Sequence, residues 1–165
     1  GGFGLVCVCD YVIATQKAHF ALPETTLGLP PAQIAPFVVK RLGLTATREL
    51  ALFAGTLEGE NAHAINLVNT LVDDADQGKQ VLDYKLKQLL RCAPEATAIT
   101  KGLLLNHKGL SQEALLDLAA TQFSGQFTAS NAEATEGTKA FMEKRPPRWA
   151  QRPPEVDLEA EREPV

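Results

Sequence analysis

The opening segment GGFGLVCVCDYVIATQKAHFALP constrains the fold most, because it joins a tight glycine turn to two short strand patterns. Gly1 and Gly2 run directly into an apolar stretch, which favours a short helix over residues 2–9. The segments DYVIAT and AHFALP are rich in β-branched and aromatic residues, as short strands are. Two or three such strands leave sheet edges unpaired and are barely stable alone. We therefore expect an α/β fold with further strands upstream, so that these residues form the C-terminal part of a longer protein.

The rest of the chain has helical patterns almost throughout. Pro31 and Gly43 are suited to begin and end a helix over AQIAPFVVKRL, and Gly55 is expected to end the next helix. Later helices are expected in EGENAHAINLVN, QGKQVLDYKLKQLLRCA, PEATAITKGLLLNHKG, LSQEALLDLAATQFSGQF and AEATEGTKAFMEK, with a small strand around LVNTLVDD. The spacing of Ser130 and Glu133 predicts a capping box, in which each side chain bonds the backbone N–H of the other residue.

Composition excludes several functional classes. The chain has 165 residues, 22% of them charged, and a formal net charge of −4, which argues against a nucleic-acid-binding protein. No apolar run reaches the roughly 18 residues that span a membrane. Cys7, Cys9 and Cys92 lack the CxxC spacing of metal-binding motifs, so we expect buried or unreactive thiols and a cytosolic location.

Glu24 is the main candidate for chemistry. It lies in ALPETTLG, directly after the second strand pattern and at a turn marked by proline. A carboxylate beside an apolar run is poorly hydrated, which suits a general acid or base. An ordinary solvated glutamate in a turn fits the same spacing. The glycines at positions 2 and 4 also fit the start of a dinucleotide-binding GxGxxG motif, but Cys7 replaces its third glycine.

Two stretches resemble motifs of the crotonase family, also called the enoyl-CoA hydratase/isomerase family. GGFGLVCVCDYVIATQKAHFALPETTLGLPP is similar to the family's glycine turn, short helix, Cys-Asp, strand, Ala-x-Phe-x-x-Pro-Glu and Leu-Gly-x-x-Pro. EGTKAFMEKRPPRW is similar to its closing Glu-Gly-x-x-Ala-Phe-x-Glu-Lys-Arg-x-Pro-x-Trp. The resemblance covers residues 1–149. It implies a crotonase-like ββα spiral over residues 1–72, a helical trimerisation region over 73–149 and an extended tail over 150–165.

The resemblance also implies an enzyme that acts on acyl-CoA thioesters without a metal or a redox cofactor. Family members hold the thioester oxygen with two backbone N–H groups, and one of these donors falls on Gly1, with Gly2 beside it. The second donor is expected upstream, so the isolated chain is expected to be inactive. Of the family's two hydratase glutamates, one falls on Glu24 and the other on Gly4, which leaves one carboxylate. A site with a single glutamate resembles that of the family's double-bond isomerases. It also resembles that of family hydratases that act on branched or dicarboxylic acyl groups.

Further parts of the resemblance bear on substrate and assembly. AQIAPFVV stands where the wider family has Gly-Gly-Gly-Gly-Thr-Gln-Arg-Leu, and it resembles the methylglutaconyl-CoA and isohexenylglutaconyl-CoA hydratase type. Lys144 falls on a lysine that can reach the CoA phosphates, although a lysine at a helix C-terminus fits equally. Phe123 or Phe127 falls near the adenine. We therefore expect a homotrimeric or hexameric enoyl-CoA hydratase, with an isomerase or a non-catalytic oligomer component as the alternatives.

Overall fold

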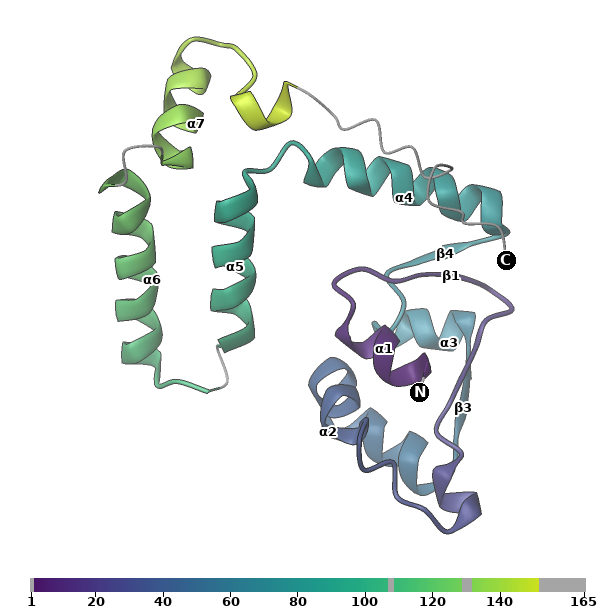
Figure 1. Ribbon diagram of the computed structural model, residues 1–165. Helices are drawn as coiled ribbons and strands as arrows, with labels where there is room; N and C mark the ends of the chain where they lie inside the picture. The colour runs from purple at the N-terminus through teal and green to yellow at the C-terminus, as the bar shows by residue number, and fades with distance from the viewer. Residues whose placement is uncertain (1, 107–108, 129–131, 152–165) are drawn as a thin grey trace, which may run out of the picture. The chain divides into compact units, whose positions relative to one another are not determined.

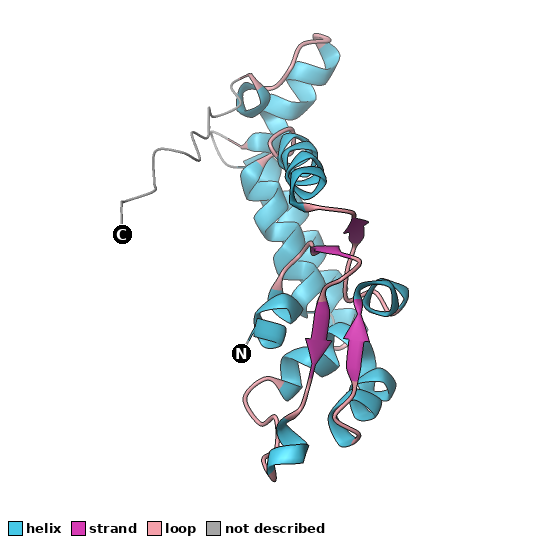
Figure 2. Cartoon of the chain, turned by 90° about the vertical axis from the view of Figure 1, so that its right-hand side faces the viewer, coloured by secondary structure: helices cyan, strands magenta, loops and turns pink. Residues whose placement is uncertain are grey.

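The computed structural model describes residues 2–106, 109–128 and 132–151 (Figure 1). The chain divides into two compact units, Gly1–Tyr84 and Lys85–Val165. Short strands lie only in the first unit, as far as the described residues go, and helices make up most of both units (Figure 2). The predicted mixed α/β character with a mainly helical second part is confirmed.

The first unit alternates short strands with helices. Its elements are α1 (Gly2–Val8), β1 (Ile13–Thr15), β2 (His19–Ala21), the 3-10 helix η1 (Glu24–Leu27), α2 (Ala35–Leu52), β3 (Thr56–Glu58), α3 (Gly59–Ala64) and β4 (Thr70–Val72), followed by the first part of α4 (Ala75–Leu89). The expected opening helix and the two expected strands after it are confirmed. The sequence patterns missed β3, because three residues are too few to establish an alternation.

The four strands form two separate pairs. β1 runs parallel to β4, with Ile13 opposite Thr70, and β2 runs antiparallel to β3, with His19 opposite Glu58. Each pair therefore brings together segments that lie far apart in the chain. The second pair fixes β2, which leads into the turn that carries Glu24.

The helix α2 is interrupted at Gly43, which has φ 77° and ψ 169°. This left-handed φ favours glycine, so the expected helix end at Gly43 is confirmed as a kink between two helical segments. The first segment begins at Ala35, later than the sequence predicted, and Pro36 lies in its first turn. The second segment ends at Leu52, before Gly55.

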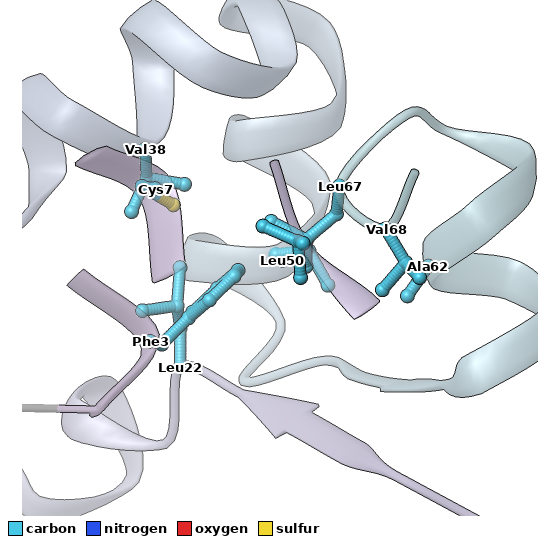
Figure 3. Close-up of a cluster of buried hydrophobic side chains, with 9 residues drawn as sticks. Phe3, Cys7, Leu22, Val38, Leu50, Ala62, Leu67 and Val68 are labelled. Atoms are coloured by element: carbon cyan, nitrogen blue, oxygen red, sulfur yellow. The ribbon is translucent and has the colours of Figure 1, made fainter. Parts of the chain in front are cut away.

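The core of the first unit is a cluster of buried side chains from α1, α2, α3 and the segments between them (Figure 3). Leu22, Val38, Leu67 and Val68 are the largest fully buried side chains. Leu22 directly precedes the turn that carries Glu24, so the core fixes the start of that turn.

Arg41 of α2 ties three segments of the first unit together. Its Nη1 donates to the carbonyl oxygen of Cys9 at 3.2 Å, and its Nη2 donates to the Leu67 carbonyl and to Asn69 Oδ1, both at 3.0 Å. Asn69 Oδ1 also accepts the backbone N–H of Val12 at 2.9 Å. One side chain thus holds the segment after α1, the start of β1 and the turn before β4.

The three cysteines differ in exposure. Cys7 is buried, and burial raises the pKa of its thiol, while the nearby Arg41 charge lowers it to a lesser extent. Cys9 and Cys92 are exposed. These two thiols are therefore not buried, because Cys9 lies just beyond the C-terminus of α1 and Cys92 just beyond that of α4, and the alternative that they are unreactive remains a prediction.

The second unit contains the end of α4, then α5 (Pro94–Asn106), α6 (Gln112–Thr128), α7 (Glu133–Met142) and the 3-10 helix η2 (Arg148–Ala150). α5 packs against α6, and α6 packs against α7. Figure 1 shows α5 and α6 running side by side. The helices expected in this part are confirmed. No described helix is long and apolar enough to cross a membrane.

The predicted capping box before α7 is wrong. Among the described residues, the Glu133 Oε1 and Oε2 accept the backbone N–H groups of Glu95 and Ala96, at 3.0 and 2.9 Å. Ala132 is the N-cap residue of α7, and Ser130 lies outside the described residues. The Glu133 carboxylate therefore caps α5, the helix that begins 39 positions earlier at Pro94.

The residues after α7 fold back on that helix. Arg145 donates to both carboxylate oxygens of Glu136, at 2.8 and 3.2 Å, and the Arg148 backbone N–H donates to Oε1 at 3.0 Å. Trp149 contacts Gly137, and its Nε1 donates to the Arg91 carbonyl at 3.2 Å. The EGTKAFMEKRPPRW stretch thus forms a closed local structure. Of the expected tail at 150–165, residues 152–165 lie outside the described residues.

Candidate active site

A pocket of about 470 Å³ lies beside α1 in the first unit. Its walls come from α1, from β2 and the turn after it, and from the residue that precedes α2. The lining residues are Gly2, Phe3, Val6, His19, Phe20, Ala21, Pro23, Glu24 and Ile34. The rings of Phe3 and Phe20 have centroids 6.2 Å apart. Most of its lining side chains are apolar, and Glu24 is the only carboxylate among its described lining residues.

Local backbone structure sets the place of Glu24. It is the first residue of η1, between the buried Leu22 and a turn that ends at Gly28. The carbonyl oxygen of Glu24 accepts the backbone N–H of Leu29 at 3.1 Å and is also bonded by the N–H of Gly28. Gly28 has φ 72°, which favours glycine and closes this turn. The position of Glu24 is therefore fixed by the turn that follows it.

One oxygen of the Glu24 carboxylate accepts no hydrogen bond from the described residues. Its Oε2 is buried, and no hydrogen-bond partner for it exists among the described residues. A buried polar atom without a partner is costly, and native structures keep few of them. An oxygen in this state, in the wall of a pocket, is suited to accept a proton or a hydrogen bond from a bound water molecule or ligand.

Gly4 and Ile34 meet at the edge of this pocket. A Cβ atom placed on Gly4 would lie 2.6 Å from Ile34 Cγ2 and 3.1 Å from Ile34 Cβ. Ile34 is the N-cap residue of α2, and its carbonyl oxygen accepts the backbone N–H of Val38 at 3.0 Å. The missing side chain at Gly4 therefore leaves the room that Ile34 fills.

The other residues expected in the site fall in different places. Gly2 lines the pocket with Glu24, and Gly4 lies next to it through Ile34. Gly1 lies outside the described residues. Lys144 and Phe127 belong to the second unit. Lys144 is exposed in a left-handed conformation with φ 53°, and the exposed Phe127 ring contacts Phe123 edge to face at 5.3 Å.

Comparisons with known proteins agree with this arrangement. The pattern of the enoyl-CoA hydratase/isomerase family matches residues 1–152. The chain belongs to this family. Its sequence is 53% identical to that of Pseudomonas aeruginosa AtuE, and its structure matches the solved AtuE structure with a TM-score of 0.87. The match covers 91% of this chain and 57% of the AtuE chain. An enoyl-CoA hydratase/isomerase structure from Marinobacter aquaeolei is 45% identical, with a TM-score of 0.86 and coverage of 91% and 56%.

Curated members of the family give the same picture. The mitochondrial methylglutaconyl-CoA hydratase of Mus musculus is 29% identical over 154 residues, which are 90% of this chain and 48% of that protein. The chain spans about half the length of the curated relatives it matches. The crotonase resemblance is thereby confirmed, and family members act on acyl-CoA thioesters.

Sequence reasoning missed the contact between Ile34 and Gly4. Ile34 lies in AQIAPFVV, which stands where the resemblance to the family implies a glycine-rich segment, so the signal was an apolar side chain in place of glycine. That signal alone does not name its contact, because the partner lies 30 positions away in α1.

Proposed function

We propose that the protein hydrates an α,β-unsaturated acyl-CoA thioester in the pocket beside Glu24. The observation that carries this proposal is the buried, unpartnered Oε2 of Glu24 in the wall of a pocket whose other lining side chains are mostly apolar. Membership of the enoyl-CoA hydratase/isomerase family supports the thioester as the substrate class. The AQIAPFVV segment, together with relatives named methylglutaconyl-CoA hydratase, supports a branched glutaconyl-type acyl group.

In this reaction the Glu24 carboxylate accepts a proton from water while the water oxygen bonds to Cβ of the enoyl group. The electron pair of the Cα–Cβ double bond moves toward the thioester oxygen, which becomes an enolate oxygen. Glu24 then returns the proton to Cα, and the thioester carbonyl forms again. The product is a 3-hydroxyacyl-CoA, and Glu24 ends in the ionised state in which it began.

The enolate oxygen needs fixed donors. We assign one donor to the backbone N–H of Gly1, on the resemblance of the opening glycine turn to the family's turn. A second donor would come from the part of the family fold that these residues do not span. Each such donor lowers the barrier by on the order of 3 kcal/mol, because it stabilises charge that develops only during the reaction.

Substitution of Glu24 by glutamine in the whole protein tests this assignment. Glu24→Gln keeps the size of the side chain and removes the base, so kcat should fall at least ~100-fold. The Kd for a saturated acyl-CoA should change little. Glu60→Gln is the matched control, because Glu60 lies in the first turn of α3 and does not line the pocket. A kcat near that of the wild type in Glu24→Gln would refute the catalytic role.

A double-bond isomerase is the second candidate. It is favoured by the single carboxylate in the described pocket wall, because one base can remove a proton from the acyl chain and return it two carbons away. Reaction in ¹⁸O-labelled water separates the two reactions. A hydratase places the label in its product, whereas an isomerase releases an unlabelled product. Absence of both activities would favour the non-catalytic alternative.

Two further parts of the proposal concern the second unit. Lys144 and Phe127 are proposed to bind the CoA phosphates and the adenine, and their exposure supports this role. Lys144→Met should then raise KM without lowering kcat. A lysine that only stabilises the end of α7 would instead change the stability and leave KM unchanged.

Association into trimers or hexamers is supported by large apolar side chains on α5, α6 and α7 that are more than half exposed. They are Leu104, Leu116, Phe123, Phe127, Phe141 and Met142. Exposed apolar area of this kind is typical of interfaces. Sedimentation of the whole protein should show trimers or larger species at micromolar concentration, and monomers alone would contradict the proposal. The cytosolic location also remains a prediction, since some relatives are named mitochondrial.

A further inference from the structure

Ile34 both lines the pocket and lies against Gly4. It is one of the lining residues, and its Cγ2 occupies the space directly above Gly4. A Cβ on Gly4 would come within 2.6 Å of that methyl group, and real Cβ atoms do not approach other carbon atoms so closely. A side chain at position 4 would therefore require Ile34 to shift or to be smaller.

We propose that Ile34 is the residue that determines which acyl groups this pocket accepts, because it fills the place left free by Gly4 with an apolar wall. This inference deepens the proposed function and rests on it for the identity of the ligand as an acyl-CoA. The proposed role of Ile34 is in substrate selection and not in the reaction itself, since its side chain has no group that can transfer a proton.

The sequence pattern supports a reciprocal pair. On the resemblance to the family, a glutamate is expected at position 4 and a glycine at position 34. This chain has the opposite arrangement, with glycine at position 4 and isoleucine at position 34. The short distance supplies a physical link between the two positions, because a side chain at position 4 requires Ile34 to shift or to be smaller. At this place in the site, the apolar side chain of Ile34 therefore takes the space that the resemblance gives to a carboxylate.

The backbone keeps Ile34 in this place. Its N–H donates to the Pro31 carbonyl at 3.2 Å, and its carbonyl accepts the N–H groups of Phe37 and Val38, both at 3.0 Å. The wall therefore does not move aside readily for a bulkier acyl group. Acyl groups with an additional carbon near this wall should be rejected relative to slimmer ones, because the size of a hydrophobic pocket limits what enters it.

Binding of saturated acyl-CoA thioesters to the whole protein tests the selection without relying on turnover. Butanoyl-CoA and 3-methylbutanoyl-CoA are compared by calorimetry in the wild type, Ile34→Ala, Ile34→Val and Val8→Ala. In Ile34→Ala the ratio of the two Kd values should shift at least ~10-fold toward the branched ligand. Ile34→Val keeps Cγ2 and should shift the ratio less. Val8 is an exposed α1 residue outside the pocket lining, so Val8→Ala should leave the ratio unchanged.

A double-mutant cycle tests the packing half of the inference by thermal unfolding. Gly4→Ala should lower the Tm in the wild type, because the new Cβ meets Ile34. In an Ile34→Gly background the same substitution should leave the Tm unchanged or raise it, because alanine favours a helix over glycine. An equal Tm change in both backgrounds would overturn the reciprocal pair.

The outcomes separate the two levels of the proposal. A Kd ratio in Ile34→Ala within ~2-fold of the wild type, in a protein that still hydrates enoyl-CoA, overturns the role of Ile34 and leaves the proposed function standing. Failure of the wild type to bind either thioester overturns both. A shifted ratio in a protein that binds thioesters but hydrates none supports Ile34 and refutes the hydratase assignment.

Discussion

Arg145 binds the carboxylate of Glu136 with two nitrogen atoms, at 2.8 and 3.2 Å, although the two residues lie nine positions apart in sequence. The Glu136 side chain is 9% exposed, and the backbone N–H of Arg148 bonds the same carboxylate. The hydrogen bonds from Arg145, together with that from the Arg148 backbone, lower the pKa of Glu136 from its ordinary value of 4.5 to about 2. The closing motif of the family thus acts here as a structural clasp.

The clasp predicts loss of stability in acid. A carboxylate whose pKa is lower in the folded state stabilises that state above its unfolded pKa, and this contribution is lost as the pH falls. The contribution of Glu136 should therefore be complete above about pH 4.5 and disappear as the pH approaches about 2. Urea unfolding at a series of pH values, followed by the fluorescence of Trp149, measures it. The 165 residues contain one tryptophan, whose ring lies beside Gly137 near the clasp.

Glu136→Gln is the matching variant. It should unfold at a lower urea concentration than the wild type at pH 7 and should show a weaker dependence on pH between about 4.5 and 2. Lys139→Gln is a suitable control, since Lys139 is 63% exposed and its nearest carboxylate contact is 4.0 Å long. Equal pH dependence in Glu136→Gln and the wild type would contradict the assignment of the acid sensitivity to this clasp.

Glu133 predicts a second stability effect. Its carboxylate caps the N-terminus of α5, so Glu133→Ala should lower the free energy of unfolding of the second unit by about 1 kcal/mol. Glu133→Asp is one methylene shorter and should restore little, because the carboxylate must reach the N–H groups of a different helix. Chemical denaturation measures both variants. A capping box local to α7 would be indicated instead if Glu133→Ala changed the helicity of α7 without changing hydrogen exchange at Glu95 and Ala96.

Two glycines of the first unit should respond in opposite directions to alanine. A Cβ on Gly59 would lie 2.5 Å from the Thr15 carbonyl oxygen and 2.8 Å from that of Gln16, so Gly59→Ala should destabilise the protein by about 1–3 kcal/mol. A Cβ on Gly78 would meet only ordinary contacts at 3.7 and 3.9 Å. Gly78→Ala should therefore stabilise α4 by about 0.5–1 kcal/mol. The denaturant midpoints of the two variants, compared with that of the wild type, show whether each substitution stabilises or destabilises the protein.

The cysteines should differ in reactivity. Burial raises the pKa of the Cys7 thiol and shields it, whereas Cys9 and Cys92 are exposed. Brief treatment of the native protein with iodoacetamide should modify Cys9 and Cys92 and spare Cys7, as mass spectrometry of the peptides can measure. Denatured protein should react at all three positions. Fast modification of native Cys7 would mean that α1 opens readily.

Local patterns were enough to predict α1, the strands that follow it and the helices of the second unit, because glycine turns, β-branched runs and helical spacing act over a few residues. The same patterns brought Glu24 to attention, since a charged residue at the end of an apolar strand stands out. They failed wherever the partner is remote. Glu133 was assigned to its own helix, but its two donors lie 37 and 38 positions away.

The pairing of Gly4 with Ile34 illustrates the same limit. The missing glutamate at position 4 was visible in the sequence, and so was the exchange of glycines for larger residues in AQIAPFVV. Only the folded chain places the two changes in contact and gives them one cause. The strand β3 escaped notice for a different reason, because its three residues become a strand through pairing with β2 and have no pattern of their own.

Arg41 couples the segment after α1 to the segment before β4, so neither segment can change in length without affecting the other. Its guanidinium spans acceptors on Cys9, Leu67 and Asn69, so these atoms must stay within the reach of one planar group. A single residue inserted between Leu67 and Asn69 would displace at least one acceptor, and the disturbance would reach α1 and the pocket that α1 lines. For anyone grafting a loop or a tag into this protein, the short connection before β4 is a place to avoid, even though it lies far from Glu24 in the sequence.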